Sequence, residues 1–355
     1  MSFAAGWREG RRYLDDHRHE LALWAAETLY PDHPRAAGTG LLTRPDWVRT
    51  TPVPLADVRL AWREPAADPP VNGTEPDCGP YATYAEAVAD LAPPRVFEDR
   101  PCYRLLDVSA GPGRVDLGFG LGRYFDVINT CEAAAHELAD ARRLAPAAVP
   151  PDLPLRSMIG DPCDVARRPV MVAISALTLR RSPAGATFVL HRRDAAKVAH
   201  AGGMTQVMPV GVFQPSGPGP EHQHDDFDLW RSLSREYHEE FLGAPEQPGA
   251  DGPFFRALDE ARRDGCITAH FLGLGVDPLS LVTDILVAVV FDAGVYDALF
   301  AGAVAVNAEG HVTGHHPFDE ATVGSIVTTS PMQAAGAAAL ALAWQHRATL
   351  LPGSD

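Results

Sequence analysis

Arg235-Glu236-Tyr237-His238-Glu239-Glu240 holds three glutamates within a segment whose apolar residues recur with helical spacing. The segment Asp226–Phe241 is predicted to be one helix, because an apolar side chain recurs at every fourth position from Leu229 onward. At about 100° per residue, Glu240 falls inside the apolar stripe and Glu236 falls on its edge. We therefore expect Glu240 to be buried, unlike the glutamates of an ordinary solvated helix face.

Buried carboxylates need a compensating partner. Removing one carboxylate from water is costly, and clustering three raises that cost further. A hard divalent cation offsets both costs, since Mg2+ prefers oxygen ligands and usually keeps waters and substrate phosphates in its shell. Glu236, Glu239 and Glu240 are therefore candidate ligands for Mg2+ or Mn2+, and Arg235 can pair with one carboxylate and fix its rotamer. The alternative interpretation is an acidic surface helix with one i,i+4 ion pair.

The pattern resembles a known family. Residues 235–240 are similar to the core of the Nudix box, the signature G-x5-E-x7-R-E-U-x-E-E-x-G-U of Nudix hydrolases. Val170–Leu179 and Thr187–Arg192 resemble the early strands of that family, and Gly202–Gly211 resembles the glycine-rich passage that leads into the box. The resemblance covers roughly residues 170–350. It implies an α/β fold class, with a Nudix-type α/β/α sandwich in the C-terminal half of the chain.

The resemblance also implies a metal site and a reaction. In this family the loop–helix–loop of the box holds Mg2+ or Mn2+, which polarises a diphosphate linkage for attack by water. Glu236, Glu239 and Glu240 match the metal ligands, and Glu236 and Glu240 are expected to be catalytic. Gly211 and Arg235 match structural positions of the box. The implied substrate is a nucleoside diphosphate linked to another group, as in a nucleotide sugar, ADP-ribose or a nucleoside triphosphate.

Two further roles are expected outside the box. In several Nudix subfamilies the general base comes from a loop after the box, and here Glu309 and Glu320 are candidates, because a base must reach the water within one hydrogen bond. Arg192 and Arg193 follow an apolar run and are candidates for gripping a substrate phosphate or carboxylate. For any single arginine, the alternative is an ordinary surface position.

The sequence departs from the box pattern in ways that favour a second function. Phe227 stands where the pattern has its first glutamate, and the last glycine is displaced to Gly243. Extra residues, Pro215–His224, are rich in Pro, Gly and His and predict an inserted loop. The alternative function is a non-hydrolytic Nudix-fold sensor or regulator that binds a nucleotide-derived ligand, as in similar actinobacterial sequences. The lost glutamate favours the sensor, and the three retained carboxylates favour the enzyme.

Composition restricts the class of protein. A net charge of -16 opposes nucleic-acid binding, because such binding needs a basic patch. No uncharged apolar run approaches about 18 residues, so no membrane span is expected. The five cysteines form no C-x2-C pair, which predicts reduced thiols and a cytoplasmic location. The expected partner is a small nucleotide-like molecule, and the Nudix resemblance adds a possible homodimer.

The chain is long enough for two domains, and a Pro-rich stretch at residues 145–154 marks the expected boundary. Residues 1–150 are predicted to form a β-rich α+β accessory domain that shapes the pocket or a dimer interface, and residues 160–355 the Nudix-like domain. The other elements expected from periodicity and turn residues are helices at Met1–Tyr30, Tyr84–Leu91, Glu132–Leu144, Pro253–Arg263 and Ser330–Leu350, and strands at Val58–Trp62, Cys102–Val108, Arg114–Phe119, Tyr124–Asn129 and Leu281–Phe291.

Overall fold

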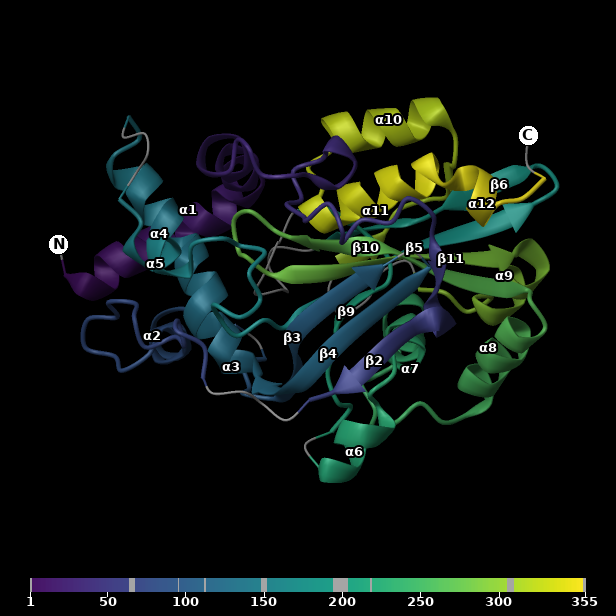
Figure 1. Ribbon diagram of the computed structural model, residues 1–355, viewed down its shortest axis with the longest axis horizontal. Coiled ribbons are helices and arrows are strands. Elements are labelled where there is room, and N and C mark those ends of the chain that lie inside the picture. Colours follow the sequence, from purple (N-terminus) through teal and green to yellow (C-terminus); the bar gives the residue numbers. More distant parts are fainter. Residues whose placement is uncertain are drawn as a thin grey trace.

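The computed structural model of the chain has helices layered around a central β-sheet (Figure 1). It describes residues 2–63, 68–94, 96–111, 113–147, 152–193, 204–217, 219–304 and 310–353, without the side chain of Arg193. This described part is a mixed α/β structure with several sheets, which confirms the expected α/β class, while the Nudix-type sandwich stays a prediction.

The central sheet has seven strands. In spatial order they are β1 (Val53–Pro54), β10 (Ile267–Val276), β11 (Thr283–Asp292), β5 (Val172–Ser182), β6 (Gly185–Phe188) and β13 (His316–Pro317), and β9 (Val210–Val212) also pairs with β5. β5 and β11 run parallel, whereas the other pairs of this sheet are antiparallel. Nearly every residue of β11 is buried, which confirms the strand predicted from its Val- and Ile-rich sequence.

Two three-stranded sheets flank the central one. Their strands are β2 (Val58–Trp62), β4 (Arg114–Arg123) and β3 (Pro101–Gly111) in one sheet, and β12 (Gly310–Val312), β7 (Leu190–Arg193) and β8 (Thr205–Val207) in the other. β3 and β4 pair antiparallel, and they contain the strands predicted at Cys102–Val108 and Arg114–Phe119. β3 is joined to the central sheet, because Leu105 N donates to Val170 O at 2.8 Å and Tyr103 N donates to Phe213 O at 3.2 Å.

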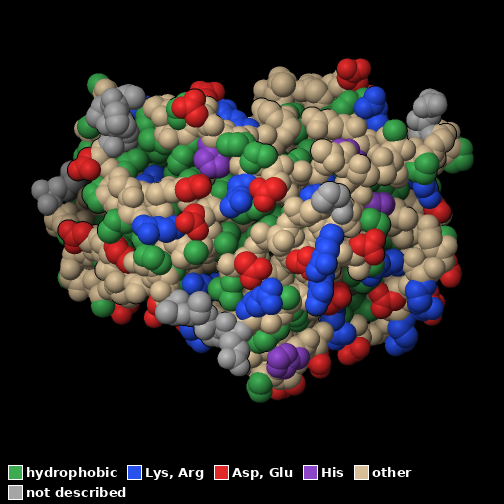
Figure 2. Space-filling view, in the orientation of Figure 1, with side chains coloured by type: hydrophobic (Ala, Val, Ile, Leu, Met, Phe, Trp, Pro, Cys, Tyr) green, Lys and Arg blue, Asp and Glu red, His purple; other side chains and the backbone are tan. Residues whose placement is uncertain are grey.

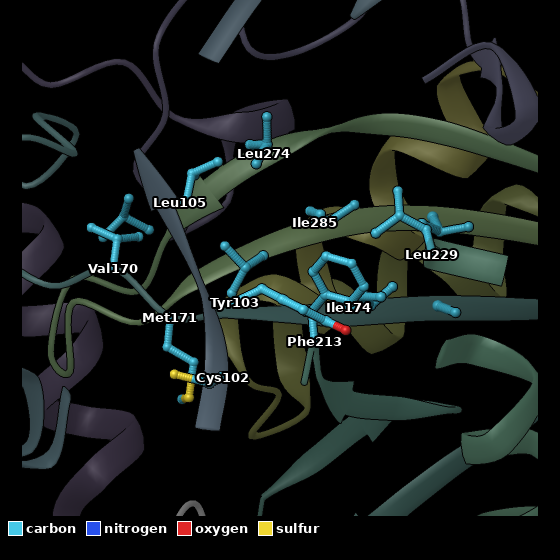
Figure 3. Packing of buried hydrophobic residues seen from close by; sticks show 14 of the residues in the cluster. Cys102, Tyr103, Leu105, Val170, Met171, Ile174, Phe213, Leu229, Leu274 and Ile285 are labelled. Carbon is cyan, nitrogen blue, oxygen red and sulfur yellow. The ribbon is translucent and has the colours of Figure 1, made fainter. Parts of the chain in front are cut away.

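Helices cover both faces of the central sheet. The helices concerned are α7 (Leu229–Glu236), α8 (Pro253–Arg263) and α9 (Ala293–Leu299) on one face, and α10 (Glu320–Thr329) and α11 (Ala334–Gln345) on the other. Neighbouring residues of β11 show the division. Ile285 packs with Ile174 and Leu229 of α7 (Figure 3), whereas Leu286 packs in the cluster that holds Leu340 of α11. Since alternate strand residues point to opposite sides, α7 and α11 lie on opposite faces.

The remaining helices lie mostly in the first half of the chain. They are α1 (Phe3–Trp24), which continues as a π-helix (Ala25–Leu29), α2 (Tyr84–Leu91), α3 (Tyr124–Val127), which continues as a π-helix (Ile128–Glu132), α4 (Ala133–Leu144), α5 (Pro154–Ile159), α6 (Pro220–Asp225) and α12 (Arg347–Leu350). Helices therefore account for more of the described residues up to 147 than strands do, and the expectation of a β-rich first half is wrong.

Three predicted elements differ from the structure. Tyr124–Asn129 is helical rather than a strand, because the Asp126 carboxylate accepts from Arg123 N at 3.0 Å and caps the helix start. The box helix begins at Leu229 rather than Asp226, since Asp228 caps it by accepting from Arg231 N at 2.8 Å. The last predicted helix, Ser330–Leu350, begins at Ala334 instead and is divided at His346 into α11 and α12.

The predicted loop at Pro215–His224 also contains structure, because α6 begins at Pro220. Proline at the first helical position suits this start, since its missing N–H would have no partner there.

Buried hydrophobic residues from both sides of residue 150 belong to one cluster, which includes Trp7, Phe119, Phe213 and Phe291. The domain boundary near residue 150 stays a prediction. Acidic and basic side chains are interspersed over the face shown in Figure 2, so the acidic excess is not gathered in one patch there. Among the described residues, no helix combines the length and the apolar character needed to cross a membrane.

Candidate functional site

The box helix is fixed to the central sheet by its buried face. Glu240 is 6% exposed, as its place in the apolar stripe predicts, and its Oε1 accepts from Val210 N of β9 at 2.9 Å. The Tyr237 hydroxyl lies 2.8 Å from Thr178 Oγ1 of β5, and burial raises the pKa of Tyr237. These two contacts set the rotation of the helix about its axis, and that rotation decides where Glu236 and Glu239 lie.

Gly211 is a position of close approach rather than of unusual backbone conformation. A Cβ atom at Gly211 would overlap the side chain of Glu236, which lies directly against the strand. Only glycine leaves room for the Glu236 carboxylate there. This packing supports the structural role expected for Gly211.

Arg235 pairs with a carboxylate outside the three glutamates. Its Nη1 lies 3.0 Å from Asp226 Oδ1, and its Nη2 donates to Gln214 O at 2.8 Å. The Asp226 side chain is fully buried and also accepts from Ser216 N, Ser216 Oγ and Arg231 Nε. Burial alone would raise the pKa of Asp226, but the Ser216 hydrogen bonds and the charge of Arg235 outweigh it, and that pKa is lowered.

The residue next to Asp226 explains the departure from the box pattern. Phe227 packs against the rings of Trp62, Tyr103, Phe119 and Phe213, with ring centroids 5.0–5.8 Å apart. The position where the pattern has a glutamate is therefore part of an aromatic cluster, and the neighbouring Asp226 supplies the carboxylate that Arg235 contacts.

The end of the box helix is wound as a π-helix from Tyr237 to Phe241. A π-turn holds one residue more than an α-turn, and such turns are frequent at functional sites. Gly243 then follows with a φ of 65°, a conformation that favours glycine. The one-residue displacement of this glycine coincides with the π-turn.

Glu236 and Glu239 line a cavity of about 420 Å³, a volume typical of small-molecule sites. Gly211 and Arg235 line it from the same side, and its other walls come from segments far away in the sequence. Those further residues include Arg11, Arg18 and Glu132 from the first half of the chain, Asp277, Ser280 and Asp284 around the start of β11, and Gln206, Gln333 and Ala335 beside the start of α11.

The wall from α1 is a buried ion-pair cluster. Arg11 and Arg18 are 9% and 4% exposed, and both contact the Glu132 carboxylate, which is 7% exposed. Asp15 lies 3.4 Å from Arg11 and 3.3 Å from Arg18. Burial alone would lower the pKa of Arg11, but the charge of Glu132 outweighs it and the pKa is raised. Arg11 therefore stays charged at the cavity wall.

Asp284 is a buried acid that sequence reasoning did not single out. It lies in β11, is 6% exposed, and accepts from Ser175 Oγ at 2.8 Å. Burial raises the pKa of Asp284 to about 7, although the Ser175 hydrogen bond opposes this and Asp277 adds to it. The available signal was an aspartate inside the Val- and Ile-rich run Leu281–Phe291, where an apolar residue is expected.

Among the described residues, two of the other predicted site residues lie away from this cavity. Arg192 is exposed on β7 and Glu320 is exposed in the first turn of α10, and neither lines the cavity. The side chain of Arg193 and the whole of Glu309 lie outside the described residues. Their roles in substrate binding and as general base stay predictions.

The donor chemistry of the three glutamates fits a hard divalent cation, since all of their ligand atoms are carboxylate oxygens. Their oxygens do not already converge: in the described part of the chain, the cluster of three ligand atoms within 4.8 Å of one another is His33, Asp161 and Cys163. That mixed nitrogen, oxygen and sulfur set suits softer metals than Mg2+. Binding Mg2+ at the box helix therefore requires rotamer changes of the glutamates.

Comparison of the chain with protein-family models gave no match, and comparison with curated proteins gave none either.

Proposed function

We propose that the protein is a metal-dependent hydrolase of a nucleoside diphosphate linked to another moiety, of the nucleotide-sugar, ADP-ribose or nucleoside-triphosphate type. The observation that carries the proposal is the placement of Glu236 and Glu239 on the wall of a cavity of about 420 Å³, with Glu240 buried behind them. A solvated acidic helix face would have no reason to bury Glu240 or to press Glu236 against Gly211.

In this proposal Glu236, Glu239 and Glu240 hold Mg2+ or Mn2+. The bound metal supplies polarisation of a phosphoryl oxygen and a lowered pKa for its water. The chain itself fixes the orientation of the box helix through the Val210 N–H and the Asp226–Arg235 pair. Arg11 and Arg18 also line the cavity, where Glu132 and Asp15 balance their charges.

The alternative, a sensor that binds without hydrolysis, was favoured by the missing glutamate at Phe227. That argument is weaker once Asp226 is seen to pair with Arg235, because the loss of the glutamate does not leave the arginine without a carboxylate. The sensor is nevertheless one outcome of the test that follows.

The test is a substrate panel with Mg2+, with Mn2+ and with a chelator. Nucleoside triphosphates, nucleotide sugars, ADP-ribose and dinucleoside polyphosphates are assayed for released nucleoside monophosphate. We expect metal-dependent turnover of at least one class, and a loss of at least about 100-fold in Glu239→Gln and in Glu240→Gln. The exposed Glu260→Gln is the matched control and should keep wild-type turnover.

Turnover that persists in the chelator or in both glutamine variants would contradict the proposal. No turnover, together with thermal stabilisation by one panel member, would favour the sensor.

A further inference from the structure

The cavity has a second end, on the α11 side of the central sheet. Asp284 precedes Ile285, and Ile285 packs on the α7 side with Leu229 (Figure 3). Because neighbouring strand residues point to opposite faces, the Asp284 side chain lies on the face that α11 covers. Gly211, which is in register with Ile174 and Ile285, faces Glu236 on the α7 side. The single cavity therefore has the acidic box helix at one end and Asp284 at the other.

Gln206 lies at the same end as Asp284. It belongs to β8, which meets the start of α11, where Gln333 N donates to Thr205 O at 3.0 Å. Gly336 allows this approach, since a Cβ there would lie 3.4 Å from Gln206 Cα. Gln206 is therefore held against the first turn of α11, whose residues Gln333 and Ala335 also line the cavity.

The side-chain oxygen of Gln206 has an unmet hydrogen-bonding capacity. Gln206 is 3% exposed, and no donor among the described residues reaches its Oε1. A buried acceptor without a donor is costly, and native structures rarely keep one without a reason. Because this atom is on a residue that lines the cavity, a ligand that donates a hydrogen bond would satisfy it.

The chemistry of this end selects one kind of group. Asp284 and Gln206 offer acceptor oxygens, so the group must carry N–H or O–H donors. Asp277 lines the cavity beside Asp284, and the two carboxyl groups oppose an anionic group such as a phosphate. Met204, Val282 and Ala335 add apolar surface that suits the flat face of a ring.

We propose that the Asp284–Gln206 end of the cavity binds the nucleobase of the substrate, while the phosphates lie toward the box helix. The choice of a nucleobase rests on the proposed function, which makes the ligand a nucleotide. The positions of Asp284 and Gln206 make them specificity-determining residues, and Ser175 positions Asp284 through its hydrogen bond of 2.8 Å.

The test measures binding without catalysis. Calorimetry of the full chain, with a chelator present, uses AMP, GMP, CMP and UMP, and ribose 5-phosphate as a probe that has sugar and phosphate but no base. The pH is 8, above the pKa of about 7 of Asp284. We expect at least one nucleoside monophosphate to bind at least about tenfold more tightly than ribose 5-phosphate, because only it satisfies the buried acceptors.

Variants assign that preference to residues. Asp284→Asn and Gln206→Met, which keep side-chain size, should each remove about tenfold of nucleotide affinity while ribose 5-phosphate affinity stays constant. Ser175→Ala should lower nucleotide affinity by less than either of these two variants. Asp292→Asn, at the far end of the same strand and paired with Arg181, is the control and should bind like wild type. Thermal unfolding of each variant verifies that it is folded.

Three results would overturn the inference: no binding of any nucleoside monophosphate, equal binding of ribose 5-phosphate, or unchanged base preference in both the Asp284 and Gln206 variants. Because no metal and no turnover are involved, these results are independent of whether the protein hydrolyses its ligand. A failed hydrolase test with a confirmed base preference would leave this site in place.

Discussion

The box helix and α1 lie on two walls of one cavity, and each carries charged residues in its buried stripe. In the box helix the buried charged residues are Arg235 and Glu240, and Glu240 lies among apolar residues. In α1 they are Arg11 and Arg18, which alternate with Leu14 and Leu21 on the buried face. The difference lies in the partners: Glu240 meets a backbone N–H of the adjacent strand, whereas the arginines meet Glu132, more than a hundred residues away. In both helices a charged residue inside an apolar stripe lines the cavity or adjoins a residue that does, but the sequence does not name its partner.

The largest effect on stability is expected when the ion-pair cluster of Arg11, Arg18 and Glu132 is broken. Glu132→Ala removes the carboxylate that the buried Arg11 and Arg18 share, so we expect a loss of about 3–5 kcal/mol in the free energy of unfolding. Denaturant unfolding measures this loss, and Glu20→Ala, at an exposed position of α1, is the control. A loss no greater than that of the control would mean that the ion-pair cluster contributes little and that the two walls are not comparable.

The next largest effect is a pH dependence of stability that comes from Asp284, at the α11 end of the cavity. The pKa of Asp284 is about 7 in the folded protein and about 3.9 in an unfolded chain. The folded state therefore binds the proton more tightly, and this residue lowers stability as the pH rises from about 4 to 7. Asp284→Asn has no carboxyl group to titrate, so its stability should not show this loss. The free energy of unfolding of the variant minus that of the wild type should therefore be roughly 2–4 kcal/mol larger at pH 8 than at pH 5.

Thermal or denaturant unfolding of wild type and Asp284→Asn at both pH values provides the comparison. An equal difference between the two proteins at pH 5 and pH 8 would show that Asp284 does not titrate in this interval. The Ser175 hydroxyl and Asp277 are the groups that the structure places against this carboxyl.

Asp226→Asn tests the ion pair between Asp226 and Arg235 of the box helix. This change keeps the size of the side chain but removes the charge that faces Arg231 and Arg235, and we expect a loss of about 2 kcal/mol. The neighbouring Asp225 is exposed, so Asp225→Asn is the matched control. The lowered pKa of Asp226 predicts that the stabilisation is present at neutral pH and declines as the pH falls below about 4. If the two variants were equally stable, Asp226 would not be the partner that replaces the missing glutamate.

The smallest effect on stability is expected at Gly211. In Gly211→Ala the new methyl group displaces the Glu236 side chain, which is flexible enough to move at a cost of about 1 kcal/mol. Turnover should fall much more than stability, because Glu236 leaves its place at the cavity. Gly294→Ala, where nothing lies within 4 Å of the added atom, is the control. Full activity in Gly211→Ala would separate Glu236 from the reaction.

Elements with complete local signals were predictable. Tyr84–Leu91 and Pro253–Arg263 were expected with the bounds that the structure gives, because each has a cap residue or a starting proline and helical spacing. Ile267–Val276 was missed, since Gly273 and Gly275 interrupt its pattern where the chain packs closely against Trp47 and Leu41.

The site shows the same limit. Burial of Glu240 followed from helical geometry, and it is confirmed. The pairing of Arg235 with Asp226 depended on a helix start at Leu229 that the sequence pattern placed too early. Other parts of the cavity are lined by α1, Glu132 and β11, and no local pattern encodes that these distant segments meet at one cavity.

The central claim is that Glu236, Glu239 and Glu240 form a metal site on the cavity wall, and direct measurement of Mn2+ binding tests it without a substrate. The free Mn2+ signal in electron paramagnetic resonance is followed as protein is added. We predict that wild-type protein and Glu260→Gln reduce that signal, and that Glu239→Gln and Glu240→Gln, while folded, reduce it far less. Equal loss of the signal with both glutamine variants and with wild type would contradict the account.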